Sequence, residues 1–295
     1  MKVLVVTGDI RFGPGNLRFD LQRRQVEELV PVYLGRRTLW PKVPGGHFDV
    51  VSVQDPFWRG LYGFILSRRL NARFNVQVHA DLSHLSFWRN ILARIVLRHA
   101  DSVRVVSEKI KKQVASMGVS ASIHILPVYV EVERFKELSH VPQSQKTILW
   151  IGRFEEEKDP LKALDVFIEV RKTTDAKLVM LGVGSLAPLL RAKARGLPVE
   201  FPGWQDPLPY LEQADVVIST SKQESYGASI VEALAAGVAV VAPDVGIARE
   251  AGAIVVPHNL LPAQVLEVLR KSVRGKLNIT LLNEQQYGRL WRETL

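Results

Sequence analysis

The feature of this sequence that most constrains its fold is a regular alternation of short apolar runs with amphipathic segments. Nearly every residue of the short runs is apolar, as is typical of parallel strands covered on both faces. The alternation predicts an α/β fold with doubly wound parallel sheets. In the first half the expected strands are Val3–Gly8, Phe48–Val53, Phe74–His79, Ser102–Val106 and His124–Val128, and the expected helices are Leu17–Val30, Trp58–Leu70, Phe87–His99 and Lys109–Met117.

The same pattern starts again after a polar stretch, Leu138–Lys146, which has no apolar periodicity and is expected to be a linker. The 295 residues are about twice the length of a typical domain. We therefore expect two Rossmann-like domains that face each other across a cleft. They are residues 1–140 and 141–275, with a tail, 276–295, that packs back toward the first domain. The second series contains strands Thr147–Ile151, Lys177–Leu181, Val199–Phe201, Val216–Thr220, Ala239–Ala242 and Ile254–Val256, and helices Pro160–Thr173, Leu186–Ala194, Leu208–Gln213, Tyr226–Ala236 and Pro262–Val273.

Composition excludes several classes of protein. No stretch approaches the roughly 18 uninterrupted apolar residues of a transmembrane helix. The absence of cysteine excludes disulfides, thiol catalysis and Cys-ligated metal sites. The apolar run at the start, Met1–Gly8, is too short for a signal peptide and is expected to be the first strand of a cytoplasmic protein.

The net positive charge of the chain comes entirely from its first half. Residues 1–140 hold 21 Lys and Arg against 12 Asp and Glu, whereas residues 141–295 hold 18 of each. A basic half suits nucleic acid, an anionic membrane surface or an acidic substrate. The segment Phe87–Arg98, followed by Lys109, Lys111 and Lys112, combines aromatic and aliphatic residues with arginines at helical spacing, as interfacial helices do. The alternative is that its aliphatic residues pack on the sheet and its arginines are solvated.

The loop after the first strand of the second series carries two cations. Gly152 allows a close turn, and Arg153 and Lys158 could meet the two sides of a diphosphate. Asp159 and Pro160 fit an N-cap and a first helical residue. Taken alone, this loop favours the simpler interpretation of solvated charges balanced by the three glutamates between the cations.

Two glycine-rich segments are weak dinucleotide signals. Gly182-Val183-Gly184-Ser185 follows a strand but lacks the third glycine of the dinucleotide fingerprint, and Gly8–Gly15 also lacks that spacing. A nicotinamide dehydrogenase is therefore disfavoured. At the first segment, a close approach to a ligand and a plain turn remain equally good interpretations.

The most informative segment is Glu224–Gly237. A helix is expected to start near Tyr226, and the N–H groups of its first turn would form an anion site aided by the helix dipole. Glu224 and Glu232 would be up to roughly 12 Å apart at 1.5 Å per residue. That is too far for a glycosidase pair, but it suits a ligand with a diphosphate between two hydroxylated rings. The small first turn consists of Gly227, Ala228 and Ser229.

These residues resemble a known signature. Glu224 and Glu232, followed by Ala233–Ala242, are similar to the signature of retaining GT-B glycosyltransferases, most closely glycosyltransferase family 4 (glycosyl transferases group 1). The Gly152–Lys158 loop and Tyr210–Asp215 are similar as well. The resemblance covers nearly the whole chain. It implies a retaining hexosyltransferase that moves a hexose-type sugar from a UDP-sugar or GDP-sugar to a hydroxyl of a glycan or lipid-linked acceptor, with neither cofactor nor metal.

The resemblance also implies residue roles. Arg153 and Lys158 would hold the diphosphate and stabilise the leaving group. Glu224 would bind the transferred sugar and Glu232 the ribose. His79 would reach the donor sugar from the first domain, and no protein nucleophile would be needed. The other donor-binding candidates are Gly152, Gly182, Gly184, Gly203, Trp204, Tyr226, Gly227, Ala228 and Ser229, with the base along Gly203–Asp206, and the acceptor-side candidates are Gly13 and Gly15.

Other interpretations compete with this one. His79, Asp81 and His84 have a spacing that could suggest a metal, which the resemblance disfavours. A non-catalytic nucleotide-sugar or nucleic-acid binding module would use the basic first half, but aromatic–basic RNA motifs are missing, so nucleic acid is not an expected partner. A phosphorylase of the same fold would need a lysine-bound pyridoxal cofactor, for which no motif is found. The expected location is the cytoplasm, with an anionic membrane face as a candidate partner.

Overall fold

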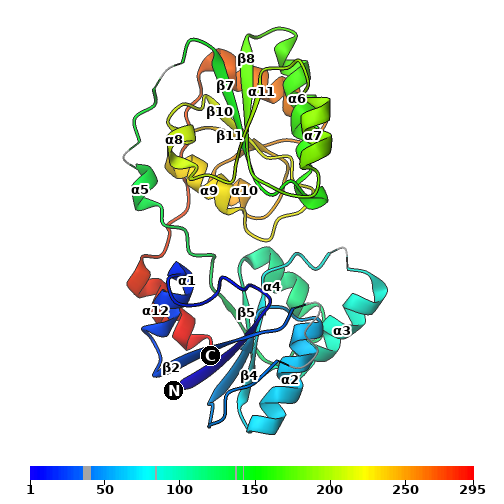
Figure 1. Ribbon diagram of the computed structural model, residues 1–295, viewed down its shortest axis with the longest axis vertical. Helices are drawn as coiled ribbons and strands as arrows, with labels where there is room; N and C mark the ends of the chain where they lie inside the picture. Colours follow the sequence, from blue (N-terminus) through cyan, green and yellow to red (C-terminus); the bar gives the residue numbers. More distant parts are fainter. Residues whose placement is uncertain (36–40, 84, 137, 142) are drawn as a thin grey trace. The chain divides into compact units, whose positions relative to one another are not determined.

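The chain folds into two compact units, and the first is built from both ends of the chain (Figure 1). The computed structural model describes residues 1–35, 41–83, 85–136, 138–141 and 143–295. The first unit comprises Met1–Tyr129 together with Leu281–Leu295, and the second comprises Val130–Thr280. The division therefore lies at Tyr129 rather than at residue 140, and the second unit ends at Thr280 rather than at residue 275. Within the expected linker, Val141 N–H donates to the Glu212 carbonyl at 2.8 Å, and Pro142 lies outside the described residues.

The first unit is a six-stranded parallel sheet with the order β2-β1-β3-β4-β5-β6. Helices α1 and α12 contact each other on one side of the sheet, and α2 and α3 contact each other on the other side (Figure 1). The strands are β1 (Lys2–Thr7), β2 (Glu28–Tyr33), β3 (Val50–Val53), β4 (Arg73–Val78), β5 (Ser102–Val105) and β6 (Ser122–Ile125), and the helices are α1 (Leu17–Arg23), α2 (Trp58–Leu70), α3 (Phe87–Arg98), α4 (Glu108–Ala115) and α12 (Glu284–Glu293).

The second unit is also a six-stranded parallel sheet, with the order β12-β11-β10-β7-β8-β9. Its strand order is that of the doubly wound dinucleotide-binding fold. Helix α6 packs against α7 and α11, and α9 packs against α10. The strands are β7 (Lys146–Ile151), β8 (Ala176–Leu181), β9 (Val199–Gly203), β10 (Val216–Ile218), β11 (Val240–Ala242) and β12 (Ile254–Val255), and the helices are α5 (Glu133–Lys136), α6 (Pro160–Arg171), α7 (Ala187–Lys193), α8 (Leu208–Leu211), α9 (Ala228–Ala235), α10 (Ala248–Ala251) and α11 (Leu261–Lys271), with a 3-10 turn η1 (Glu156–Lys158).

The expected helix Leu17–Val30 is wrong in its second half. Helix α1 ends at Arg23, and the chain then forms strand β2. The stretch Leu29–Tyr33 holds two valines and Pro31, which cannot continue a helix. Because β2 is an edge strand, the proline that lacks an N–H is tolerated there. The single-turn helices α5 and α10 were not expected, since four residues show no periodicity.

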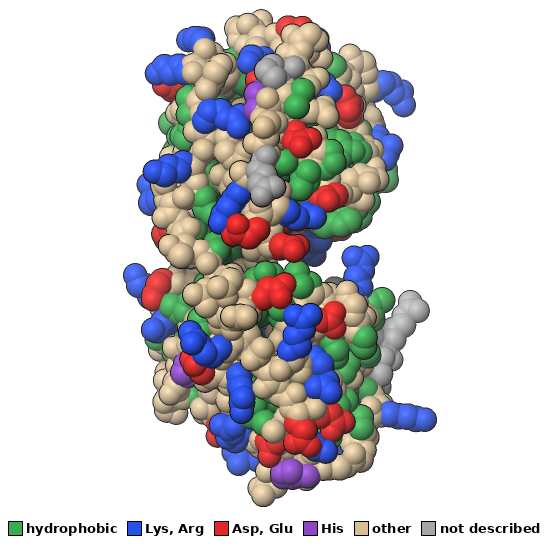
Figure 2. All heavy atoms as spheres, turned by 90° about the vertical axis from the view of Figure 1, so that its left-hand side faces the viewer, with side chains coloured by type: hydrophobic (Ala, Val, Ile, Leu, Met, Phe, Trp, Pro, Cys, Tyr) green, Lys and Arg blue, Asp and Glu red, His purple; other side chains and the backbone are tan. Residues whose placement is uncertain are grey.

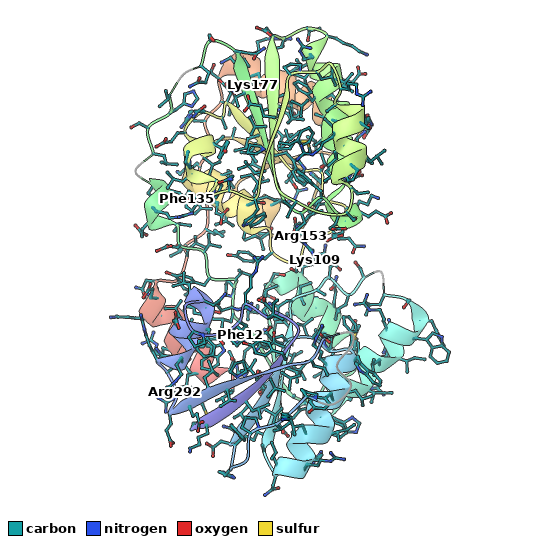
Figure 3. The ribbon with its side chains drawn as sticks, in the orientation of Figure 1. Phe12, Lys109, Phe135, Arg153, Lys177 and Arg292 are labelled. Carbon is teal, nitrogen blue, oxygen red and sulfur yellow. The ribbon has the colours of Figure 1, made fainter. Side chains whose placement is uncertain are left out.

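The C-terminal helix α12 completes the core of the first unit. Trp291 is fully buried, and Tyr287 is 4% exposed; both pack in one cluster with Phe12 and Phe19. Phe12 lies inside this unit (Figure 3), its ring edge-on to that of Phe19 at 5.4 Å. The Asn75 side chain of β4 donates to the Thr294 carbonyl at 2.9 Å. The last fifteen residues thus belong to the first unit.

Candidate functional site

The second sheet has a topological switch point between β7 and β10. From β7 the chain runs outward through β8 and β9, then returns to place β10 on the other side of β7. In open parallel sheets, ligands bind beyond the carboxyl ends of the strands at such a point. The loop after β7 carries Lys158, and the loop after β10 carries Glu224. The two residues selected from the sequence therefore lie at the expected ligand-binding position.

Lys158 and Glu224 form an ion pair. The Lys158 Nζ donates to Glu224 Oε1, and the Ser221 hydroxyl donates to the same oxygen at 3.0 Å. The two side chains are 20% and 11% exposed, so the pair is largely screened from water but still reachable. The structure thus brings a cation and a hydrogen-bonding carboxylate together at the switch point.

A buried polar chain supports the Lys158 loop. The Trp150 indole N–H donates to the Thr220 hydroxyl at 3.0 Å, and this hydroxyl lies 2.8 Å from the Asp159 carbonyl and 3.1 Å from the Lys158 carbonyl. The expected N-cap at Asp159 and the first-turn Pro160 are confirmed. Sequence reasoning did not select Trp150 and Thr220; the polar run Ser219–Ser221 after an apolar strand was the available signal.

Arg153 is placed differently from Lys158. Its guanidinium is 64% exposed and bonds Glu157 at 2.6 Å (Figure 3). The neighbouring Glu155 accepts from the Ser185 N–H and hydroxyl, at 2.9 and 2.7 Å. Within the described residues, Arg153 forms no ion pair or hydrogen bond with Glu224. The two cations of this loop are therefore paired with different carboxylates, Arg153 with Glu157 and Lys158 with Glu224.

Two glycines allow the loops after β7 and β8 to contact each other. A Cβ on Gly182, whose φ is 156°, would lie 1.8 Å from the Gly152 carbonyl oxygen, and one on Gly184 would lie 2.5 Å from that of Phe154. The Phe154 N–H donates to the Val183 carbonyl at 2.9 Å. Close packing of these two loops is by itself a sufficient reason for glycine at Gly182 and Gly184.

Helix α9 begins at Ala228 rather than near Tyr226. Gly227 is its N-cap with φ 99°, a conformation that favours glycine, and no side chain caps the helix. Among the described residues, the N–H groups of Ala228 and Ser229 have no backbone acceptor, whereas the Ile230 N–H donates to the Gly227 carbonyl at 3.0 Å, so the first two N–H groups are available to an anion. The Tyr226 side chain is buried, its hydroxyl has no partner among the described residues, and burial raises its pKa to about 12.

Glu232 lies on α9 as expected, and burial raises the pKa of its carboxyl to about 7. The nearby Arg134 charge lowers this pKa and the Asp206 charge raises it. Arg134, on the unexpected helix α5, forms a two-pronged bond with Asp206 at 2.7 and 3.2 Å. Asp206 belongs to the expected base-binding segment, in which Gly203 ends β9 and Trp204 is 61% exposed.

Replacing Glu232 with Gln should remove a pH dependence of stability. Because the folded pKa of about 7 lies above the ordinary value of 4.5, the folded state retains a proton that the unfolded state releases between those pH values. Stability therefore falls as pH rises through this window, by at most about 3 kcal/mol and roughly 1–2 kcal/mol after allowing for partial exposure. Urea unfolding from about pH 4 to pH 8 should show wild type weakening relative to Glu232→Gln. A constant difference across that range would contradict the raised pKa.

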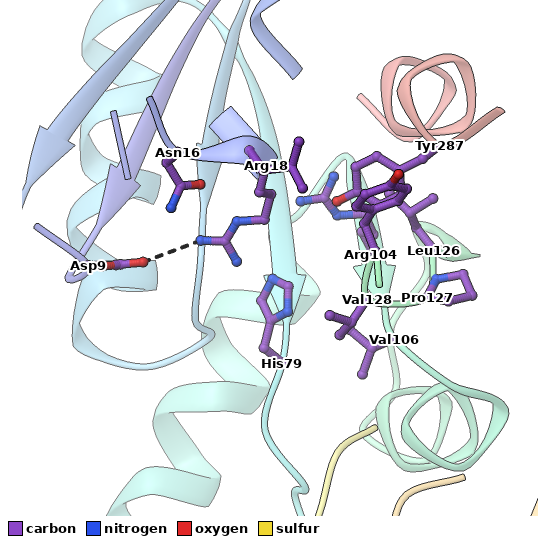
Figure 4. Close-up of a pocket in the computed structure, with 12 residues that line it drawn as sticks. Asp9, Asn16, Arg18, His79, Arg104, Val106, Leu126, Pro127, Val128 and Tyr287 are labelled. Carbon is purple, nitrogen blue, oxygen red and sulfur yellow. Dashed lines mark ion pairs between the residues drawn. The ribbon is translucent and has the colours of Figure 1, made fainter. Parts of the chain in front are cut away.

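A polar pocket is lined only by residues of the first unit. His79 follows β4 and lines a cavity of about 320 Å³ together with Asp9, Arg18 and Arg104 (Figure 4). Its Nε2 is 3.2 Å from Gln77 Oε1, and burial followed by the positive charges of Arg104 and Arg18 lowers its pKa to about 3, so the ring is neutral at pH 7. The complete lining is Asp9, Asn16, Leu17, Arg18, His79, Arg104, Val106, Leu126, Pro127, Val128, Tyr129 and Tyr287.

The acceptor-side glycines lie in the loop between β1 and α1. A Cβ on Gly13 would lie 3.2 Å from the Tyr33 hydroxyl, and Gly15 has φ 87° with open space around it. Asp9 from the same loop lines the pocket. The loop that contains both glycines therefore also contributes a wall of the His79 pocket.

Asp81 is engaged by neighbours other than a metal. Its carboxylate pairs with Lys109 at 2.8 Å and accepts from Ser83 and Gln113. His84, the third member of that spacing, lies outside the described residues. Among the residues that the structure describes, no group of three or more His, Asp or Glu side chains is arranged to hold a metal ion.

Helix α3 divides its apolar residues between the core and the surface. Ala93, Val96 and Leu97 are buried, while Phe87 and Trp88 are 71% and 76% exposed. The two exposed rings contact each other edge-on at 5.3 Å. Elsewhere, on the face shown in Figure 2, basic side chains are interspersed with acidic ones. In the described chain, no helix has the length and apolar character needed to span a membrane.

Comparison with known proteins identifies the family. The family model described as Glycosyltransferase Family 4 matches residues 10–134, and that described as Glycosyl transferases group 1 matches residues 145–271. Together the two ranges cover most of the chain. The chain belongs to the family 4, group 1 glycosyltransferases.

Similar proteins agree with this family. The chain is 26% identical to alpha-monoglucosyldiacylglycerol synthase of Streptococcus pneumoniae, over 66% of this chain and 51% of that protein. It is 28% identical to phosphatidyl-myo-inositol mannosyltransferase of Mycobacterium tuberculosis, over 69% of this chain and 57% of that protein. The chain thus spans about half the length of the curated relatives it matches.

The fold is also that of solved glycosyltransferases. HepE from Anabaena, crystallised with UDP, aligns with a TM-score of 0.72 at 16% identity, over 100% of this chain and 99% of that one. This likeness, together with the two parallel sheets, confirms the expected GT-B fold class of two Rossmann-like domains.

Proposed function

We propose that this protein transfers a hexose-type sugar from a nucleoside-diphosphate sugar to a hydroxyl of a glycan or lipid-linked acceptor. The observation that carries the proposal is the Lys158–Glu224 pair at the switch point of the second sheet. Family membership and the sugar-transferring names of the relatives support it. The donor is proposed to be a UDP-sugar or a GDP-sugar.

The residues near the switch point would have different roles in the transfer. The donor diphosphate would take over Lys158 from Glu224 and accept from the first-turn N–H groups of α9. Once released from Lys158, the Glu224 carboxylate would accept hydrogen bonds from hydroxyls of the transferred sugar. Glu232 would accept hydrogen bonds from the hydroxyls of the ribose. Lys158 would then offset the negative charge that grows on the leaving diphosphate.

The proposed stereochemistry is retention, without a metal ion. The leaving phosphate would take the proton of the acceptor hydroxyl on the same face of the sugar, so that no side-chain nucleophile is required. Arg153, exposed and paired with Glu157, would have to leave that partner to reach the diphosphate. Its role is therefore the weaker part of the diphosphate proposal.

Contact with an anionic membrane surface extends the proposal. Phe87 and Trp88 project from the start of α3 and are followed by Arg89, Arg94 and Arg98. Exposed aromatic rings beside arginines suit the boundary between headgroups and acyl chains. The two relatives described above carry lipid names, which supports a lipid-linked acceptor.

A nucleoside diphosphate should stabilise the protein, and NAD should not. At a hundredfold excess over Kd, UDP or GDP should add about 2.7 kcal/mol, a rise of roughly 5–10 °C in the melting temperature. A panel of UDP- and GDP-sugars, read by release of nucleotide, then tests transfer itself. Stabilisation without release from any donor would favour a non-catalytic nucleotide-sugar module. No stabilisation by either nucleotide would overturn the donor site.

A further inference from the structure

Arg104 is a buried cation with an unsatisfied hydrogen-bond donor. Its side chain, on β5, is 3% exposed, and its Nη1 has no hydrogen-bond partner among the residues that the structure describes. Within the described residues it forms no ion pair. Burial lowers its pKa to about 10, which still leaves it charged at pH 7. An uncompensated buried guanidinium is costly, and such a group calls for an explanation in terms of a ligand or a function.

The surroundings of Arg104 leave its charge uncompensated. Arg18 lines the same cavity, and its Nη2 lies 3.6 Å from Asp9 Oδ2, so the one carboxylate in the lining pairs with Arg18. His79 is neutral, and Tyr287 from α12 lies beside Arg104 (Figure 4). Its two arginines and one aspartate therefore give the pocket a net positive charge.

The pocket lies where the first sheet is expected to bind ligands. Asp9, His79, Val106 and Leu126 follow the carboxyl ends of β1, β4, β5 and β6. This end of a parallel sheet is the ligand-binding edge of doubly wound folds. The cavity of about 320 Å³ falls within the usual range for small-molecule sites.

We propose that this pocket binds a phosphate group of the sugar acceptor, with Arg104 as its main counter-charge and Arg18 as a second donor. The inference rests on the proposed function, because it assigns the acceptor to the first unit. Guanidinium groups meet phosphate oxygens through paired N–H donors, and one phosphate can accept from two arginines at once. The phosphate is carried either by a soluble phosphomonoester or by a lipid headgroup.

Arginine-detected NMR tests the site directly. In protein labelled with ¹⁵N-arginine, the Arg104 Nε–H signal is identified by its loss in Arg104→Gln. Inorganic phosphate should shift this signal to saturation, whereas chloride at equal ionic strength should not. A shift with acetate but not with phosphate would make the pocket a carboxylate site and overturn the proposal. No shift with either anion would overturn it too.

Melting temperatures give a second readout and a matched control. Arg73, exposed at the opposite end of the neighbouring strand β4, provides the control Arg73→Gln. Phosphate bound at the donor site should raise the melting temperatures of wild type, Arg104→Gln and Arg73→Gln equally. A smaller phosphate-induced rise in Arg104→Gln than in the other two proteins therefore reports binding at Arg104. Phosphate should bind the Arg104 site roughly 10- to 100-fold more weakly in Arg104→Gln than in wild type or Arg73→Gln. Equal stabilisation of all three by phosphate would contradict the proposal.

Two further arms identify the source of the phosphate. Glycerol 3-phosphate should reproduce the Arg104 shift if a soluble phosphomonoester is bound. If a lipid headgroup is bound, Arg104→Gln should pellet less than Arg73→Gln with vesicles of phosphatidylglycerol and phosphatidylcholine.

Failure of the site and failure of the proposed function can be distinguished. Failure of the proposed function would appear in the wild type, as no stabilisation by UDP or GDP and no release of nucleotide from any donor sugar, whereas failure of the site would appear as phosphate binding that Arg104→Gln leaves unchanged.

Discussion

Lys158→Ala should lower turnover at saturating donor by roughly 100- to 1000-fold, the loss typical of removing one group that stabilises a leaving oxyanion. The charge of Lys158 matters most as the diphosphate departs, so kcat should fall more than donor affinity. The measurement is initial rate of nucleotide release against donor concentration. Near-full turnover at saturating donor would overturn the diphosphate role.

The control for Lys158→Ala is Lys172→Ala. Lys172 caps the far end of α6, is 63% exposed and pairs with Glu169, so its removal should leave turnover unchanged. Because Lys158 and Glu224 are bonded in the structure, a double-mutant cycle should be strongly non-additive. A purely additive cycle would show that the two side chains do not act on one ligand. Melting curves of each variant separate loss of chemistry from loss of folding.

Trp291→Ala should destabilise the first unit by about 3–5 kcal/mol, the usual cost of truncating a buried tryptophan. Trp291 is fully buried and belongs to one hydrophobic cluster with residues of α1 and of the sheet. At roughly 2–4 °C per kcal/mol, the melting temperature should fall by roughly 6–20 °C. Thermal unfolding followed by calorimetry measures it.

Trp88→Ala is the matched control for Trp291→Ala. With 76% of Trp88 exposed, its loss should change stability by less than about 0.5 kcal/mol. Trp291→Phe should cost less than Trp291→Ala, since the indole N–H of Trp291 has no hydrogen-bond partner to lose among the described residues. Equal melting temperatures for Trp291→Ala and wild type would contradict the role of α12 in this core.

The parts of the fold that could be predicted are those with strong local signals. Helix α2 lies at the expected Trp58–Leu70, and β8 and β11 differ from expectation by one residue at their start. Strand β2 was not predicted, because its apolar residues continue the helical spacing of α1. Its pairing with β1 is a long-range contact that periodicity does not contain.

The candidate site could likewise be predicted only where the sequence carries a local signal. The motif predicted Lys158 and Glu224, because each stands at a strand end in a recognisable spacing. It did not predict that they bond each other, nor that Arg134 reaches Asp206 from a single-turn helix. Arg104 was not selected from the sequence, because it lies within an apolar strand and belongs to no recognisable motif. Only the three-dimensional structure shows that its guanidinium reaches a cavity.

The return of the last fifteen residues to the first unit has a consequence for biosynthesis. The second unit is one continuous segment, Val130–Thr280, and can close its core as soon as that segment has left the ribosome. The first unit begins to emerge earlier, yet its core lacks Tyr287 and Trp291 until α12 has been synthesised. Of the two units, the one whose synthesis starts first is thus the one that finishes folding last, and a chain cut short after Thr280 leaves that core open.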